Sequence, residues 1–418
     1  MTRSIEPGRV GGRVRAPASK SAMQRALACA AMAQGTSLIT NPSWCADSLA
    51  ALGVVAALGA TVERQADRLI VSGPIGSGAP LSVSCGESGL CLRMFSAIAS
   101  LSGTTVELRG EGTLRARPVG PIEAPLAMLG VHCATDAGKQ PVRVQGPLRP
   151  GTVTVDGSAS SQFITGLLLA LPMTGGDSVV NVINPASMGY LDLTIDVMRS
   201  FGAVVERAPD FSKFDVAGRP YVAGSYAVEG DWSGAAFLLV AGAIASGPEG
   251  LVVTGLSPLS SQPDRAVLEA LGRAGARCES RADGYHLRPG PLRGFAFDAN
   301  DCPDLFPPLV ALASRCPGVT TLRGASRLRG KESDRAAALA GEFGVLGLRV
   351  EVDGDVMAIH GGDEPPSGGA VSSHGDHRIA MAASIAALTA SGAVTIEGAE
   401  CVTKSWPEFY EVLSSIRA

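Results

Sequence analysis

The 418-residue chain lacks several features that mark common classes of protein. Its nine cysteines form no Cys-x-x-Cys pair and no Cys/His cluster at zinc-ligand spacing, so we expect free thiols in a reducing cytoplasm and no structural metal. The most apolar run, residues 235–245, is far shorter than the roughly 20 residues that a membrane span needs. The first 20 residues have no apolar core and do not predict a secretory signal.

The chain also lacks an excess of positive charge. Its formal net charge is −4, which argues against a general nucleic-acid binder. It has no P-loop, no Gly-x-Gly-x-x-Gly after a strand and no Ser-His-Asp order, so a dinucleotide enzyme and a covalent hydrolase are disfavoured. Aromatic residues make up 5% and hydrophobic residues 46%, which predicts a core of Ala, Val and Leu. The length predicts two domains of about 200 residues each.

What the chain does contain is a repeat. A glycine that closes one helix and opens a short apolar segment recurs at spacings of 71, 72, 73 and 72 residues, at Gly59, Gly130, Gly202, Gly275 and Gly347. This predicts one βαβαββ-like unit used six times, three per domain, with the domain break near residues 227–231. The first helix of each unit is expected at 21–33, 90–101, 162–171, 234–245, 305–314 and 378–388, and the second at 47–58, 122–129, 191–201, 264–274, 334–346 and from 407 onward.

Several of these helix starts carry groups suited to anions, which helix N-termini attract. Five of the 35 basic residues are Lys, and Lys20, Lys331 and Lys404 lie just before expected helices. A cation there opposes the helix dipole, so an anionic ligand would explain it, with solvated cap charges as the alternative. Residues 160–162, Ser-Ser-Gln, open another helix and either bind a phosphate or simply cap that helix.

Charged residues near the later helix starts allow similar alternatives. Glu332 and Arg335 are three apart, so they form either an acid–base carboxylate beside an anion-binding arginine or a surface pair on a helix. Asp304 precedes an apolar helix, where its simplest role is a cap. His377 either orients backbone or titrates, and Arg378 beside it can be a solvated charge.

Eight segments, in order along nearly the whole chain and in register with the repeat, resemble the 5-enolpyruvylshikimate-3-phosphate (EPSP) synthase family. They read APASKSAMQRAL at 16–27, LRARPVGPI at 114–122, SASSQFITGLLLA at 158–170, SMGYLDLT at 187–194, PD at 303–304, RGKESDR at 329–335, GDHRIAMA at 375–382 and VTKSWPEF at 402–409.

The resemblance implies an α/β fold, a two-domain inverted α/β barrel with three βαβαββ repeats per domain and an active site in the interdomain cleft. It implies an N-terminal domain of residues 20–228 and a C-terminal domain of residues 1–19 plus 229–418. The family moves the enolpyruvyl group of phosphoenolpyruvate to the 5-hydroxyl of shikimate 3-phosphate and releases phosphate. The resemblance implies a cytoplasmic monomer with no metal or organic cofactor and no nucleic-acid or membrane partner.

The resemblance also assigns roles to matching positions. The residues implied in catalysis are Asp304, Glu332 and Lys20. Shikimate 3-phosphate is expected at Lys20, Ser21, Arg25, Ser160, Ser161, Gln162, Ser187, Tyr190, Asp304 and Lys331. Phosphoenolpyruvate is expected at Lys20, Gly89, Arg117, Gln162, Arg335, Arg378 and Lys404.

Segment 86–94 departs from the family pattern. Glu87 replaces Asn, Leu90 replaces Thr and Met94 replaces Pro, while Gly89 is kept. Glyphosate inhibits the family in the phosphoenolpyruvate subsite, so these larger or acidic side chains predict reduced glyphosate sensitivity. A second departure is Arg327, which stands where Asn is common near shikimate 3-phosphate.

Two other functions stay open. The first is the sister enolpyruvyl transferase that acts on UDP-N-acetylglucosamine, which typically has Lys-Asn where this chain has Lys20-Ser21, and a loop Cys that residues 110–116 lack. The second is a non-catalytic anion-binding paralogue, against which Asp304, Glu332 and Lys404 argue.

Overall fold

The chain folds into two compact units in the computed structural model, which describes residues 1–76, 79–158 and 160–417. The N-terminal unit comprises Ala18–Glu229, and the C-terminal unit comprises Met1–Pro17 together with Gly230–Ala418. Ala159, part of the segment at 158–170, lies outside the described residues. Among the described residues, no helix is both long and apolar enough to cross a bilayer.

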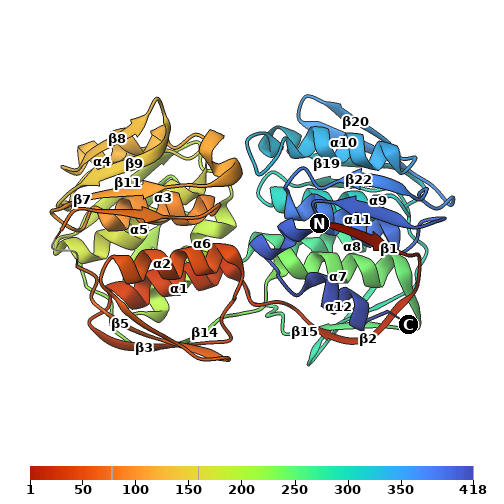
Figure 1. Ribbon diagram of the computed structural model, residues 1–418, viewed down its shortest axis with the longest axis horizontal. Helices are drawn as coiled ribbons and strands as arrows, with labels where there is room; N and C mark the ends of the chain where they lie inside the picture. The colour runs from red at the N-terminus through yellow and green to blue at the C-terminus, as the bar shows by residue number, and fades with distance from the viewer. Residues whose placement is uncertain (77–78, 159, 418) are drawn as a thin grey trace. The chain divides into compact units, whose positions relative to one another are not determined.

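The N-terminal unit contains three four-stranded sheets with the orders β14-β3-β5-β4, β6-β7-β9-β8 and β10-β11-β13-β12 (Figure 1). Each sheet joins one parallel pair to an antiparallel hairpin, as a βαβαββ unit requires. The strands are β3 (Gly35–Thr40), β4 (Thr61–Arg64), β5 (Arg68–Gly73), β6 (Leu81–Ser84), β7 (Thr105–Arg109), β8 (His132–Asp136), β9 (Lys139–Gln145), β10 (Thr152–Asp156), β11 (Ser178–Ile183), β12 (Val205–Arg207), β13 (Lys213–Val216) and β14 (Ser225–Ala227). The α-helices are α1 (Lys20–Met32), α2 (Ala46–Ala57), α3 (Gly89–Ala99), α4 (Glu123–Met128), α5 (Ser161–Ala170) and α6 (Met188–Ser200).

The C-terminal unit repeats this plan in the sheets β16-β17-β15-β2 and β18-β19-β21-β20. Its third sheet has three strands, because β1 pairs antiparallel with β23 where a hairpin would otherwise follow. The strands are β1 (Thr2–Ile5), β2 (Val10–Arg15), β15 (Ser246–Thr254), β16 (Arg277–Arg281), β17 (Gly284–Arg288), β18 (Ala296–Asp298), β19 (Gly318–Arg323), β20 (Arg349–Asp353), β21 (Val356–Gly361), β22 (Gly369–Ser372) and β23 (Val394–Glu397). The α-helices are α7 (Trp232–Ala245), α8 (Val267–Arg273), α9 (Phe306–Ala313), α10 (Arg335–Val345), α11 (His377–Ala387) and α12 (Phe409–Ser415).

Two strands are exchanged between the units. β2 precedes α1 in the sequence but pairs in parallel with β15, whereas β14 precedes α7 but pairs in parallel with β3. The crossing segments are tied together by backbone hydrogen bonds. Ser19 N donates to Glu229 O at 2.9 Å, and Asp231 N donates to Pro17 O at 2.7 Å. Each unit therefore completes one sheet with a strand that is remote in sequence.

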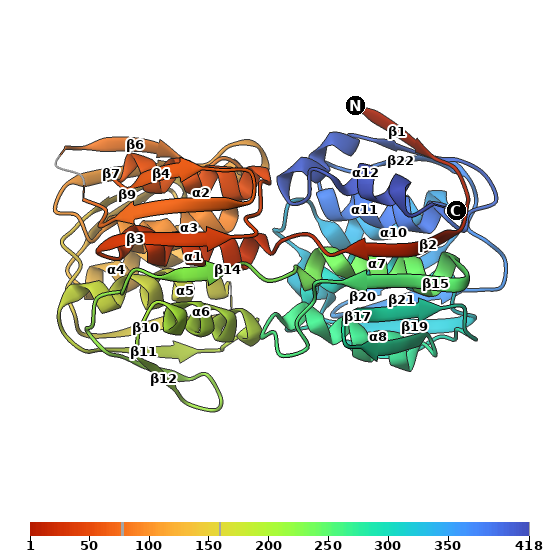
Figure 2. The same cartoon turned by 90° about the horizontal axis from the view of Figure 1, so that it is seen from below.

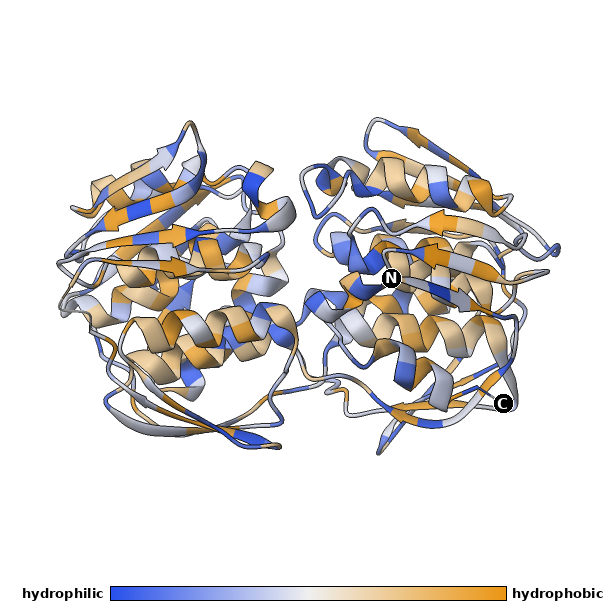
Figure 3. Cartoon of the chain, viewed as in Figure 1, coloured by the Kyte–Doolittle hydropathy of each residue, from blue (hydrophilic) through white to orange (hydrophobic). Residues whose placement is uncertain are grey.

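The central helices of each unit are buried, and the sheets lie outside them (Figures 1 and 2). Every residue of α3 is buried, and these helices are drawn mainly in the hydrophobic colours of Figure 3. Small residues permit the close packing. A Cβ on Gly166 of α5 would lie 2.8 Å from Met94 O of α3, so the two backbones are almost in contact there.

The repeat predicted from the glycines is confirmed. The five glycines follow α2, α4, α6, α8 and α10, and their φ angles lie between 82° and 106°. Glycine reaches this left-handed region without strain, so it can close a helix and turn the chain toward the next strand. The predicted helices are also confirmed, with boundaries within three residues of those observed.

Candidate active site

Lys20 begins α1 and is paired with an acid that the sequence analysis missed. Ser19 caps the helix by accepting a hydrogen bond from Ala22 N at 3.3 Å. Lys20 Nζ lies 2.8 Å from Oδ2 of Asp47, in the first turn of α2, and the two side chains are 15% and 7% exposed. The solvated-charge interpretation of Lys20 is therefore wrong. Asp47 escaped notice because an acid in the first turn of a helix is ordinary.

Arg25 of α1 joins α5 and α6 of the N-terminal unit, and its Nη2 donates to Thr165 Oγ1 of α5 at 3.4 Å. Its Nε donates to Thr194 Oγ1 at 2.8 Å, Nη1 to Ser21 O at 2.9 Å and Nη2 to Tyr190 O at 3.3 Å. The side chain is fully buried, and this burial lowers the pKa of Arg25 to about 10. Three residues of the predicted shikimate subsite, Ser21, Arg25 and Tyr190, thus lie together.

Two further helix starts present hydroxyl groups. Ser160 caps α5 by accepting a hydrogen bond from Gln162 N at 3.2 Å, and the buried Ser161 follows it as the first helical residue. Ser187 precedes α6 with a φ of 54°, a left-handed conformation that is uncommon outside glycine and clusters at functional sites. Hydroxyls beside the amides of a helix N-terminus suit a phosphate or carboxylate.

Gly89, the first residue of α3, lies against two guanidinium groups. A Cβ at this position would lie 2.8 Å from Arg93 Nη1 and 3.1 Å from Arg117 Nη1. Arg93 also donates from Nη1 to Gln162 Oε1 at 2.8 Å and from Nη2 to Pro118 O at 3.0 Å. Arg93 therefore contacts two predicted phosphoenolpyruvate residues, Gly89 and Gln162, and bonds to the residue that follows a third, Arg117. It was not among the predicted residues, because its contacts come from segments far apart in sequence.

The residues of segment 86–94 that depart from the family pattern lie in α3 and in the loop before it. Glu87 accepts from Thr113 N and Thr113 Oγ1, both at 3.4 Å, and Leu90 and Met94 are buried in α3. Their predicted effect on glyphosate sensitivity stays a prediction.

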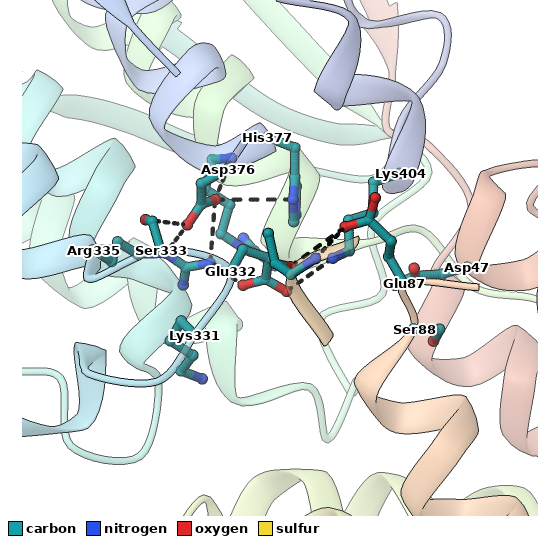
Figure 4. A network of polar contacts seen from close by, with 12 residues as sticks. Asp47, Glu87, Ser88, Lys331, Glu332, Ser333, Arg335, Asp376, His377 and Lys404 are labelled. Carbon is teal, nitrogen blue, oxygen red and sulfur yellow. Dashed lines mark hydrogen bonds and ion pairs between the residues drawn. The ribbon is translucent and has the colours of Figure 1, made fainter. Parts of the chain in front are cut away.

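Arg335 is the centre of a buried ion network in the C-terminal unit (Figure 4). Its Nη1 lies 2.8 Å from Asp304 Oδ1, its Nη2 lies 2.7 Å from Glu332 Oε2, and its Nε lies 2.9 Å from Asp376 Oδ2. Ser333 Oγ donates to the same Asp376 oxygen at 3.1 Å. One guanidinium therefore holds three carboxylates, among them both predicted acid–base residues.

Three more cations face these carboxylates. Arg378 Nη2 lies 3.0 Å from Asp304 Oδ2, Lys331 Nζ lies 3.7 Å from Asp304 Oδ1, and Lys404 Nζ lies 3.7 Å from Glu332 Oε1. Four cations thus lie against these three carboxylates, and an anionic substrate could compete with the carboxylates for them. Burial would raise the pKa of Asp304, but Arg378, Lys331 and Arg335 together hold that pKa well below its ordinary value.

Several local interpretations of these residues are wrong. Glu332 lies in the loop before α10, so its pair with Arg335 is buried and does not lie on a helix surface. Asp304 lies in the 3₁₀ helix η5 (Pro303–Leu305) and binds arginines instead of capping α9. Arg378 is 5% exposed and is not a solvated charge. Lys404 ends the 3₁₀ helix η7 (Ala399–Lys404) and does not directly precede a helix.

Comparisons with known proteins show which family the chain resembles over its whole length. The family model of EPSP synthase (3-phosphoshikimate 1-carboxyvinyltransferase) matches residues 5–413. The 3-phosphoshikimate 1-carboxyvinyltransferase of Clostridium kluyveri is 36% identical over 416 residues, 99% of this chain and 96% of that protein. That of Aeropyrum pernix is 38% identical over 415 residues, covering 99% and 95%. The solved EPSP synthase of Acinetobacter baumannii has a TM-score of 0.83 at 29% identity and covers 100% of this chain and 98% of its own.

Proposed function

The chain belongs to the EPSP synthase family and transfers the enolpyruvyl group of phosphoenolpyruvate to shikimate 3-phosphate, and we propose that the side chains described above carry this reaction. The observation that supports this most is the Arg335 network. It combines two acid–base candidates with four cations, and a reaction between two anionic substrates needs both kinds of group. Bringing two anions together costs roughly 1–4 kcal/mol per close charge pair, which a cationic site offsets.

The shikimate 3-phosphate subsite is proposed around the hydroxyl-bearing helix starts of the N-terminal unit. Ser160 and Ser161 at α5, with Ser187 at α6, offer hydroxyls and helix N-termini to the phosphate. Ser21 and Tyr190 are held together by Arg25. The full proposed set is Lys20, Ser21, Arg25, Ser160, Ser161, Gln162, Ser187, Tyr190, Asp304 and Lys331.

The phosphoenolpyruvate subsite is proposed at the arginines and lysines that the family resemblance assigns to it. Gly89 brings its backbone against Arg117 and Arg93, which a larger residue would prevent. The full proposed set is Lys20, Gly89, Arg117, Gln162, Arg335, Arg378 and Lys404.

The addition half of the reaction requires two proton transfers. The 5-hydroxyl oxygen attacks C2 of phosphoenolpyruvate while a base accepts the hydroxyl proton and an acid protonates the methylene carbon. Elimination returns a proton from the new methyl group and expels phosphate. We assign these transfers to Asp304, Glu332 and Lys20. An anionic substrate that takes over Arg378 would remove one cation from Asp304 and raise its pKa toward the range of a useful base.

A phosphate-release assay tests this proposal against its alternatives. The enzyme should release phosphate from phosphoenolpyruvate when shikimate 3-phosphate is the acceptor. Release with UDP-N-acetylglucosamine instead would assign it to the sister activity, and no release with either acceptor would indicate an anion-binding paralogue.

We also propose that the protein is a monomer in the cytoplasm. All nine cysteines are free thiols, which fits a reducing compartment. Sedimentation equilibrium and fractionation of the source cells test the two expectations separately.

A further inference from the structure

Asp376 is a fully buried carboxylate of the Arg335 network, and the proposed function gives it no role. It is 0% exposed and caps α11 by accepting a hydrogen bond from Arg378 N at 3.0 Å. We infer that Asp376 is a positioning residue, which holds Arg335 in the one orientation that serves both Asp304 and Glu332. This inference rests on the proposed function, which gives those two carboxylates their acid–base roles.

The geometry of the guanidinium carries the inference. Asp376 binds one side of Arg335 through two nitrogens, with Nε to Oδ2 at 2.9 Å and Nη2 to Oδ1 at 3.4 Å. A planar guanidinium held at two nitrogens cannot rotate about its long axis. The directions of the other N–H groups of Arg335 are then fixed. Its Nη1 donates to Asp304 Oδ1 at 2.8 Å, and its Nη2 donates to Glu332 Oε2 at 2.7 Å.

Asp376 is itself held rigidly. Its Oδ1 accepts the hydrogen bond from Arg378 N, and its Oδ2 accepts one from Ser333 Oγ at 3.1 Å. These bonds tie it both to the start of α11 and to the loop before α10. Hydrogen bonds therefore connect the α11 backbone, through Asp376 and Arg335, to the two acid–base carboxylates. The ordered backbone thus determines where those carboxylates lie.

Asp376 also contributes a negative charge. The charged and titratable groups that face it are Arg335 of α10, His377 of α11, whose Nδ1 lies 3.9 Å from Asp376 Oδ1, and Cys401 of η7. Removing this charge would leave Arg335 less neutralised, so Arg335 would attract Asp304 and Glu332 more strongly. Their pKa values would fall, and both would become weaker bases.

The test is Asp376→Asn, which keeps a cap oxygen for Arg378 N but removes the charge and one acceptor for Arg335. We expect kcat to fall at least 100-fold, the acid limb of the kcat–pH profile to move to lower pH, and the dissociation constant of shikimate 3-phosphate to stay within threefold. The matched control is Asp334→Asn. Asp334 caps α10 in the same way, accepting from Ala337 N at 3.2 Å, but is exposed. That variant should keep kcat and the pH profile.

A folded Asp376→Asn protein that keeps more than a tenth of the wild-type kcat with an unmoved acid limb overturns the inference. If this variant does not fold, Asp376→Glu decides, because it keeps the charge on a longer arm. The inference then expects kcat within tenfold of wild type and an unmoved acid limb, and a 100-fold loss would place the requirement on the helix cap and overturn it. Failure of the proposed function is a separate outcome, since the wild type would then release no phosphate from its two substrates.

Discussion

The helices that a side chain caps carry different capping residues in the two units. In the N-terminal unit the capping side chains are neutral hydroxyls, whereas in the C-terminal unit they are carboxylates. A hydroxyl leaves the positive end of the helix available to an anion, but a carboxylate neutralises it. The caps are Ser19, Ser88 and Ser160 on α1, α3 and α5, and Asp231, Asp334 and Asp376 on α7, α10 and α11.

This difference shows that two copies of one repeated fold can take different chemical roles when the residue at the helix N-cap changes. In the N-terminal unit, helix ends and hydroxyls can bind phosphate directly. In the C-terminal unit, where carboxylates occupy the helix ends, Arg335, Arg378, Lys331 and Lys404 supply the positive charge. The same unit then contains the carboxylates that acid–base chemistry needs.

The largest expected effect tests the carboxylates of the C-terminal unit. Glu332→Gln and Asp304→Asn keep the shape of each side chain but remove its titrating group, so turnover should fall roughly 10²–10⁴-fold. Shikimate 3-phosphate should still bind, because its proposed phosphate ligands lie in the N-terminal unit. Steady-state phosphate release and equilibrium binding check the two statements. A variant that keeps more than a tenth of wild-type turnover would show that its residue only balances charge.

The next effect compares one lysine from each unit. Lys20→Arg preserves charge, but a planar guanidinium is larger than the compact ammonium group beside Asp47 and does not release its proton, so we expect kcat to drop by roughly 10²-fold or more. Lys404→Arg should mainly raise the KM of phosphoenolpyruvate. The matched controls are Lys139→Arg and Lys213→Arg, at exposed positions in strands β9 and β13. Equal tolerance at all four positions would contradict the argument from the rarity of lysine.

Much of the fold could be predicted from the sequence, because its signals are local. A left-handed glycine ends a helix wherever it occurs, so the spacing of five glycines was enough to reveal the repeat. The exchange of β2 and β14 follows from no such signal. Each strand pairs with a partner more than 180 residues away in sequence, and neighbouring residues carry no trace of that partner.

The same distinction, between local signals and contacts that are remote in sequence, applies to the candidate site. Segments with distinctive residues predicted Lys20, Asp304, Glu332 and Arg335. Their actual surroundings could not be predicted, because they depend on which segments meet in space. Asp376 caps α11, but its second role depends on a hydrogen bond from Arg335, which is 41 residues away in the chain. Asp47 and Arg93 were missed because neither residue type is unusual at its position.

The third prediction tests the comparison of the helix caps by exchanging one kind of cap for the other. Ser160→Asp places a carboxylate at the start of α5, where it can still cap the helix but neutralises its positive end. We expect the KM of shikimate 3-phosphate to rise about 10–100-fold, since a like charge would face the substrate phosphate at a cost of roughly 1–3 kcal/mol. Thermal stability should change little.

The reverse swap, Asp334→Ser at the exposed start of α10, is the control for the third prediction and should leave both KM values unchanged. If Ser160→Asp also leaves the KM of shikimate 3-phosphate unchanged, the α5 N-terminus does not bind the phosphate.

The smallest expected effect concerns a buried carboxylate of the C-terminal unit and the pH dependence of stability that it causes. Asp264, in the 3₁₀ helix η4 (Pro263–Ala266), is 1% exposed, and burial, with a further contribution from Asp304, raises its pKa to about 6. Asp231 also raises it, while Arg378 and a hydrogen bond from Ser233 lower it. An ordinary aspartate in the unfolded chain has a pKa of about 3.9. The folded protein therefore binds a proton here at a pH where the unfolded chain does not, so this group stabilises the fold increasingly as pH falls through 6.

Between pH 7 and pH 5, this linkage should add about 1 kcal/mol to the free energy of unfolding of the wild type relative to Asp264→Asn. Urea unfolding of both proteins at several pH values in this interval measures the difference. The N-terminal unit offers a contrast, because its buried Arg25, with a pKa of about 10, stays charged throughout the interval and should contribute no such slope. A difference between the two proteins that is constant from pH 5 to pH 7 would show that Asp264 is ionised throughout. In that case the cations of the C-terminal unit, such as Arg378, would offset the cost of burying the Asp264 charge.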